Sequence, residues 1–99
     1  MNANGAPILV IEDDPDIRLF LATSLGGAGY EVLGAGKGRE GIDLAAEQAP
    51  ALVILDLGLP DMDGIDVVRQ LRAERELPMI ILSARTDERQ KIRALDAGA

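Results

Sequence analysis

The stretch that decides the fold is Leu52-Val53-Ile54-Leu55-Asp56, an apolar run that closes on a carboxylate and leads into Gly58-Leu59-Pro60. A second run of the same kind, Ile8-Leu9-Val10-Ile11, ends in Glu12-Asp13-Asp14. Unbroken apolar runs are typical of parallel strands buried on both faces, and open α/β sheets place their ligand sites at the carboxyl ends of such strands. If the two strands are parallel neighbours, their acidic ends share one rim. Clustered carboxylates repel one another unless a hard divalent cation binds among them or some of their pKa values rise.

Helices and strands alternate along the rest of the chain. A first helix is predicted to begin at Asp14-Pro15, an N-cap followed by a first helical residue, and to end near Gly26. Its predicted apolar face consists of Ile17, Phe20, Leu21 and Leu25. The predicted strands are 8–12, 30–35, 52–56 and 79–83, and the later helices are 38–48, 64–74 and 86–97. This order predicts an α/β fold, a doubly wound parallel sheet with right-handed crossovers and helices on both faces.

The composition restricts the chemistry. The 99 residues contain neither cysteine nor histidine, so disulfides, thiolate metal sites and histidine bases are excluded. A formal net charge of −7 argues against binding of nucleic acid by this segment, and two aromatic residues, Phe20 and Tyr30, offer no stacking platform. No apolar run has the length of a membrane span, and no signal peptide is evident. We therefore expect a cytoplasmic globular domain that contacts no membrane.

Three motifs in order carry a family resemblance. They are Ile8-Leu9-Val10-Ile11-Glu12-Asp13-Asp14, then Leu55-Asp56-Leu57-Gly58-Leu59-Pro60-Asp61-Met62-Asp63-Gly64, then Leu82-Ser83-Ala84-Arg85. Together they resemble the receiver domain of bacterial two-component response regulators. The second and third motifs and the segment 91–99 are most similar to OmpR-type regulators, in particular those that control high-affinity potassium transport. The resemblance implies a flavodoxin-like, CheY-like fold with strand order 2-1-3-4-5, a tail at 1–6 and a receiver domain at 7–99.

The resemblance also implies a role for each site residue. Asp56 would accept a phosphoryl group from a sensor histidine kinase. Asp13 and Asp56 would bind Mg²⁺, or Mn²⁺, directly, with the backbone carbonyl of Gly58 as a third ligand and Glu12 acting through a bound water. Ser83 would donate a hydrogen bond to a phosphoryl oxygen. The output would be transcription, through a DNA-binding domain outside this sequence, and the receiver would not be an enzyme in its own right.

Receivers continue beyond the point where this sequence stops. The family's fifth strand, its Lys-Pro and its fifth helix are missing, so we expect the sequence to be incomplete at its C-terminal end and to be labelled more weakly than a longer chain. The fourth strand would then become an edge strand, and part of the Ile17, Phe20 and Leu21 face would meet water. An exposed apolar edge invites pairing with another chain. We therefore expect a homodimer, exchange of elements, or aggregation.

Other interpretations of the same residues stay open. The segment Gly36-Lys37-Gly38-Arg39-Glu40-Gly41 matches a dinucleotide-binding pattern, but it follows the second strand rather than the first. Asp61 and Asp63 fit a calcium loop poorly and are interpreted as turn residues leading into the third helix. The alternative functions are an aspartyl-phosphate phosphatase or phosphotransferase enzyme, or a stand-alone phosphorelay receiver without DNA-binding output.

Overall fold

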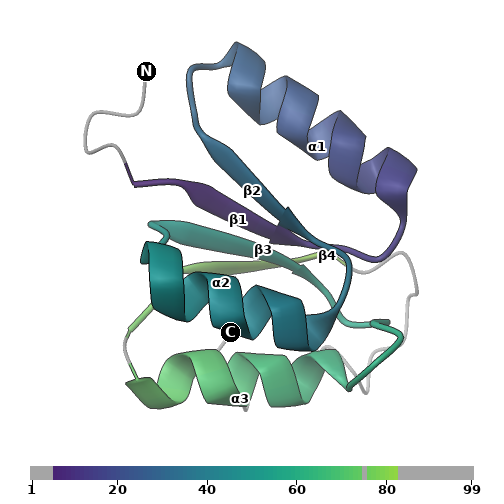
Figure 1. The fold of residues 1–99 in the computed structure, drawn as a ribbon, viewed down its shortest axis with the longest axis vertical. Coiled ribbons are helices and arrows are strands. Elements are labelled where there is room, and N and C mark those ends of the chain that lie inside the picture. The colour runs from purple at the N-terminus through teal and green to yellow at the C-terminus, as the bar shows by residue number, and fades with distance from the viewer. Residues whose placement is uncertain (1–5, 75, 83–99) are drawn as a thin grey trace.

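The computed structural model describes residues 6–74 and 76–82 and has the predicted doubly wound α/β architecture (Figure 1). Within these residues the strands are parallel and lie in the order β2-β1-β3-β4. This order confirms the expected arrangement of the first four strands. The elements are β1 (Ile8–Ile11), α1 (Pro15–Gly27), β2 (Val32–Ala35), α2 (Gly38–Gln48), β3 (Leu52–Asp56), α3 (Gly64–Glu74) and β4 (Met79–Leu82).

The register of the sheet brings the ends of β1 and β3 together. Ile11, the last residue of β1, pairs with Leu55, and the next residue of β3 is Asp56. On its other side, Asp56 pairs with Leu82 at the end of β4. The residues that follow β1 and close β3 therefore lie on the same rim, as the parallel order predicts.

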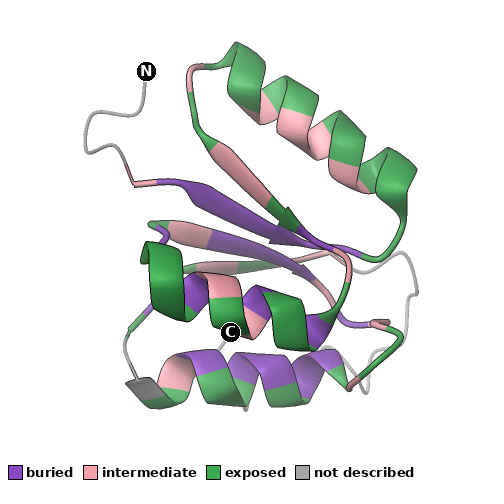
Figure 2. Cartoon of the chain, in the orientation of Figure 1, coloured by how far each residue is buried: buried purple, intermediate pink, exposed green. Residues whose placement is uncertain are grey.

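The two faces of the sheet bury separate apolar clusters. Leu9 and Ile11 of β1 belong to the larger cluster, which α2 and α3 cover, whereas Ile8 and Val10 belong to a smaller cluster on the face of α1 (Figure 1). Successive strand side chains point to opposite faces, so an unbroken apolar run supplies both clusters. Most of the core-facing side chains of α3 are completely buried, whereas α1 contains no buried residue (Figure 2).

Helix α1 contacts the sheet through only part of its predicted apolar face. Leu21 and Leu25 pack against the smaller cluster, as predicted. Phe20 is 68% exposed and Ile17 is 37% exposed. In the sheet itself, Ile80 of β4 is 49% exposed. Apolar surface on α1 and on β4 therefore meets solvent, in line with the exposure expected for these two elements.

Two predicted element boundaries were wrong. The first strand ends at Ile11 rather than at residue 12, although the Glu12 amide still donates to the Ala35 carbonyl at 2.9 Å. The second strand begins at Val32 rather than at Tyr30, because the Tyr30 amide instead donates to the Leu25 carbonyl and closes the end of α1. Gly29 makes this closure possible, since its φ of 97° is a left-handed conformation that glycine adopts without strain.

Other predicted features lie outside the described residues. These are the N-terminal tail at 1–5, Ser83 at the end of the fourth strand, and the fourth helix at 86–97. In the part of the chain that the structure describes, no helix is long and apolar enough to cross a membrane.

Candidate functional site

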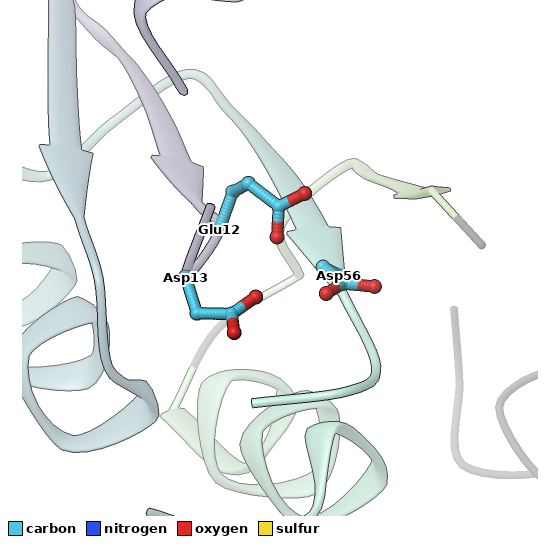
Figure 3. A group of neighbouring side chains, drawn as sticks. All are labelled: Glu12, Asp13 and Asp56. Carbon is cyan, nitrogen blue, oxygen red and sulfur yellow. The ribbon is translucent and has the colours of Figure 1, made fainter. Parts of the chain in front are cut away.

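Three carboxyl groups meet at the carboxyl ends of β1 and β3. Glu12 and Asp13 follow β1, Asp56 closes β3, and one oxygen atom of each lies within 4.8 Å of the others. Their side chains point toward a common space above the rim (Figure 3). Glu12 is 5% exposed, Asp56 is half-buried and Asp13 is exposed. The structure thus brings together the three acidic residues that the sequence predicted as one site.

Glu12 carries the electrostatic cost of this arrangement. Burial, followed by interactions with Asp56 and then Asp13, raises the pKa of Glu12 from 4.5 to about 7. Its Oε2 atom is buried and has no hydrogen-bond partner among the described residues. A buried oxygen without a partner is unfavourable, and a bound cation or its water shell would satisfy it. The donor set therefore fits a hard divalent cation such as Mg²⁺, which prefers carboxylate oxygens and retains several waters.

The loop that carries Glu12 and Asp13 is anchored by α1. Asp14 caps this helix, accepting a hydrogen bond from the Asp16 amide at 2.8 Å, and Pro15 is its first residue, as predicted. One turn further, the Arg18 guanidinium donates to the Glu12 carbonyl at 2.8 Å. The Arg18 side chain crosses the backbone of β2, where a Cβ at Gly34 would lie 3.2 Å from its Cδ. Sequence analysis missed Arg18, because this contact depends on how α1 lies across β2.

The loop that carries Gly58 is closed at its base. The Gly64 amide donates to the Leu57 carbonyl at 3.2 Å, and a Cβ at Gly64 would lie 2.5 Å from the Leu57 Cα. The Asp63 side chain accepts from the Ile65 amide at 2.9 Å, which agrees with its interpretation as a turn residue leading into α3. Gly58 lies in this loop, two residues after Asp56. A metal-binding role for its carbonyl stays a prediction.

Asp61 has a role that sequence analysis missed. Its carboxylate accepts hydrogen bonds from the amides of Gly38, at 2.7 Å, and Arg39, at 3.0 Å, at the start of α2. The Arg39 bond and then the Gly38 bond lower the pKa of Asp61. The available signal was weak: Lys37 is the N-cap residue of α2 and makes no side-chain capping bond, so this helix lacks a local cap.

The glycine pattern at 36–41 has a packing explanation. A Cβ at Gly41 would overlap the Ile11 side chain, and a Cβ at Gly38 would lie 2.5 Å from the Met62 Cγ. Both glycines therefore permit close approach of α2 to its neighbours. The two amides at the start of α2, where a dinucleotide phosphate would bind, already donate to Asp61. These contacts argue against the dinucleotide interpretation.

Ser83, the remaining predicted site residue, lies outside the described residues. Its neighbour in the chain, Leu82, pairs with Asp56 across β3 and β4. The hydrogen bond of Ser83 to a phosphoryl oxygen therefore stays a prediction.

Comparison with known proteins places this site in a family. The response regulator receiver domain family matches residues 8–99. The chain is 52% identical over 92 residues to the transcriptional regulatory protein KdpE of Mycobacterium tuberculosis, and 51% identical over 92 residues to the KDP operon transcriptional regulatory protein KdpE of Escherichia coli. These alignments cover 93% of this chain but only 41% of each relative.

A solved structure agrees in both fold and sequence. The crystal structure of the BeF3-activated N-terminal receiver domain of Klebsiella pneumoniae RstA superposes with a TM-score of 0.89 at 31% identity. The match covers 94% of this chain and 80% of that one. The strand order, the acidic rim and the match over residues 8–99 together lead to one conclusion: the chain belongs to the response regulator receiver domain family.

Proposed function

We propose that this chain is the phosphoacceptor domain of a two-component response regulator, which takes a phosphoryl group onto Asp56 from a sensor histidine kinase. The observation that carries the proposal is the cluster of Glu12, Asp13 and Asp56, in which a half-buried carboxylate lies beside a buried one whose Oε2 lacks a partner among the described residues. Family membership supports the same assignment. So does the likeness to the RstA receiver, which was crystallised in a BeF3-activated form.

The proposed step needs a nucleophile and charge neutralisation, and little else from the protein. A carboxylate oxygen of Asp56 forms the new O–P bond while the P–N bond of a phosphohistidine breaks, and the bonding electrons stay with the imidazole nitrogen. Such transfers are catalysed mainly by in-line positioning and electrostatic stabilisation. Because Asp56 closes β3, with its backbone paired to β4, its position is fixed by the sheet.

Mg²⁺, or Mn²⁺, is the proposed cofactor, and it would neutralise charge on the transferring group. Asp13, Asp56 and the Gly58 carbonyl would hold it, with Glu12 acting through a water. The buried side chain of Glu12 sets the acidic cluster against the sheet, whereas the exposed Asp13 leaves the rim accessible. An accessible rim is what a phosphodonor attached to another protein requires.

The output belongs to the part of the protein that lies outside this chain. The two KdpE relatives carry names of transcriptional regulators, and the chain spans 41% of the length of each. We therefore propose a cytoplasmic regulator in which residues 7–99 form the receiver, residues 1–6 form a tail and a separate domain binds DNA. Control of potassium transport is the corresponding specific proposal. The net charge of −7 supports assigning the DNA contact to another segment.

Stoichiometry distinguishes this function from the enzyme alternative. Incubation with acetyl phosphate and Mg²⁺ should give a slow incorporation of at most one phosphoryl group per chain. Rapid release of many equivalents of inorganic phosphate per chain would instead indicate a phosphatase or phosphotransferase. Absence of both incorporation and release would contradict the proposed function. A stand-alone phosphorelay receiver would behave like the proposed one here, and it is distinguished by transfer of the phosphoryl group onward to a histidine protein.

The chain is also proposed to self-associate through the edge at β4. Among the described strands β4 lies at the edge of the sheet, and Ile80 on it is 49% exposed. Light scattering on the purified 99-residue chain should therefore give a mass above 10.5 kDa that rises with concentration. Ile80→Lys should lower that mass toward the monomer, because a charge on an edge strand opposes pairing. A monodisperse 10.5 kDa parent would show that the described sheet needs no partner at this edge.

A further inference from the structure

The loop that follows the phosphoacceptor is held at its tip by α2. Asp61 accepts both of its hydrogen bonds from amides more than twenty residues away in the chain, at the start of that helix. Met62 adds an apolar contact, since its side chain occupies the space where a Cβ at Gly38 would lie. Two adjacent loop residues thus attach to the same helix terminus, one by hydrogen bonds and one by packing.

The same loop is held at both of its roots. On one side Asp56 belongs to the β3–β4 ladder. On the other side the Gly64 amide bonds the Leu57 carbonyl, and Asp63 caps α3. Gly58 lies between Asp56 and Asp61, so its backbone is confined by the sheet before it and by the α2 contact after it. Of these restraints, Asp61 is the only one in the described chain that links the tip of the loop to α2 by hydrogen bonds.

A local residue at position 37 would cap α2 equally well without touching the loop. The backbone of Lys37 is extended, with φ −137° and ψ 152°, which is the conformation in which serine or aspartate acts as an N-cap. The chain has a lysine there and supplies the cap from the loop instead. The physical consequence of this choice is a link between α2 and the segment that carries Gly58.

We propose that Asp61 is a positioning residue for the metal and phosphoacceptor site, which fixes the loop containing Gly58 by binding the first turn of α2. This inference rests on the proposed function, because it assigns the Gly58 carbonyl to the metal. Asp61 itself is exposed and touches neither substrate nor metal in this role. Residues that orient metal ligands indirectly typically change metal affinity by about 10- to 100-fold when removed.

The test measures Mg²⁺ binding by calorimetry, well below the melting temperature of every variant. Asp61→Ala should raise the Mg²⁺ dissociation constant by about tenfold, and Asp61→Asn, which keeps one acceptor oxygen, by less. Asp66→Ala is the matched control for charge: it removes another carboxylate, one that is exposed and only 3.9 Å from Arg69 within α3. It should leave the dissociation constant within about twofold of the parent, because exposed ion pairs contribute little.

A double variant separates positioning from capping. Lys37→Ser combined with Asp61→Ala restores a local cap to α2 and keeps the net charge at −7, since one basic and one acidic residue are removed together. The melting temperature should recover toward the parent value, whereas the Mg²⁺ dissociation constant should stay raised. Recovery of both quantities would overturn the proposal and leave Asp61 as a helix cap alone. The proposal would also fail if Asp61→Ala bound Mg²⁺ as the parent does.

A metal-free measurement keeps this inference distinct from the proposed function. Nuclear relaxation of the backbone amides of Gly58 and Leu59, recorded without Mg²⁺, should show lower order parameters in Asp61→Ala and in the double variant than in the parent. Unchanged order parameters would contradict the proposed positioning of the loop. Failure of the parent itself to bind Mg²⁺, with the loop nevertheless loosened, would contradict the proposed function and the metal-directed role, while showing that Asp61 orders the loop.

Discussion

Asp13→Asn should abolish the stabilisation of this protein by Mg²⁺. A ligand that binds only the folded state at ten times its dissociation constant stabilises by about 1.4 kcal/mol, which corresponds to roughly 6 to 11 °C in melting temperature for a domain of this size. Asp13 supplies the exposed carboxylate of the cluster with Glu12 and Asp56. Its loss should reduce the shift to about 1 °C or less at the same Mg²⁺ concentration. Differential scanning calorimetry with and without Mg²⁺ measures both values.

Asp16→Asn is the matched control for this prediction. Asp16 lies three residues further along, in the first turn of α1, and its substitution removes the same charge from a position outside the cluster. Its response to Mg²⁺ should equal that of the parent. If Asp13→Asn and Asp16→Asn respond to Mg²⁺ alike, the metal does not bind at the carboxylate cluster.

Glu12→Gln should stabilise the metal-free protein at alkaline pH. The folded state holds the pKa of Glu12 at about 7 against an ordinary value of 4.5. Between these values the folded chain binds a proton that the unfolded chain has released, so the free energy of unfolding falls as pH rises through this window and is level above it. The loss is on the order of 1 to 3 kcal/mol. Glutamine carries no charge, so the variant should lack this fall and be more stable at pH 8 by a similar amount.

Urea unfolding at pH 4.5, 6 and 8, with a chelator present, tests the pH dependence. Glu47→Gln, a change at an exposed position of α2, should keep the slope of the parent. Adding Mg²⁺ should stabilise the parent more at pH 8 than at pH 5, because metal binding requires ionised carboxylates. A Glu12→Gln variant with the same pH slope as the parent would show that the buried Glu12 is not the source of the instability.

The sheet and its order were predictable because they depend on short-range patterns. Leu52 to Asp56 and Ile8 to Ile11 form β3 and β1 as expected, and Asp14-Pro15 begins α1. Boundaries failed where backbone closure overrode propensity: Tyr30 completes the end of α1 instead of starting β2. The cluster of Glu12, Asp13 and Asp56 followed from the same logic, since parallel neighbouring strands bring their carboxyl ends together.

The residues that support the site were not predictable in the same way. Arg18 reaches the Glu12 carbonyl only because α1 crosses β2 at Gly34, and Asp61 reaches α2 across a loop. Neither contact follows from spacing or periodicity, because each depends on how two elements lie relative to one another. Asp63 illustrates the contrast: its bond to the Ile65 amide is local, and its role as a turn residue could be inferred from the sequence.

Phosphorylation of Asp56 at a Mg²⁺-dependent site is the central claim. The most direct test treats the protein with acetyl phosphate, traps the acyl phosphate by borohydride reduction, and locates the modified residue by mass spectrometry of peptides. We expect modification at Asp56 alone, with Mg²⁺ required, and none in the presence of a chelator or in Asp56→Asn. Modification at another carboxylate, or labelling of Asp56→Asn equal to that of the parent, would contradict the claim.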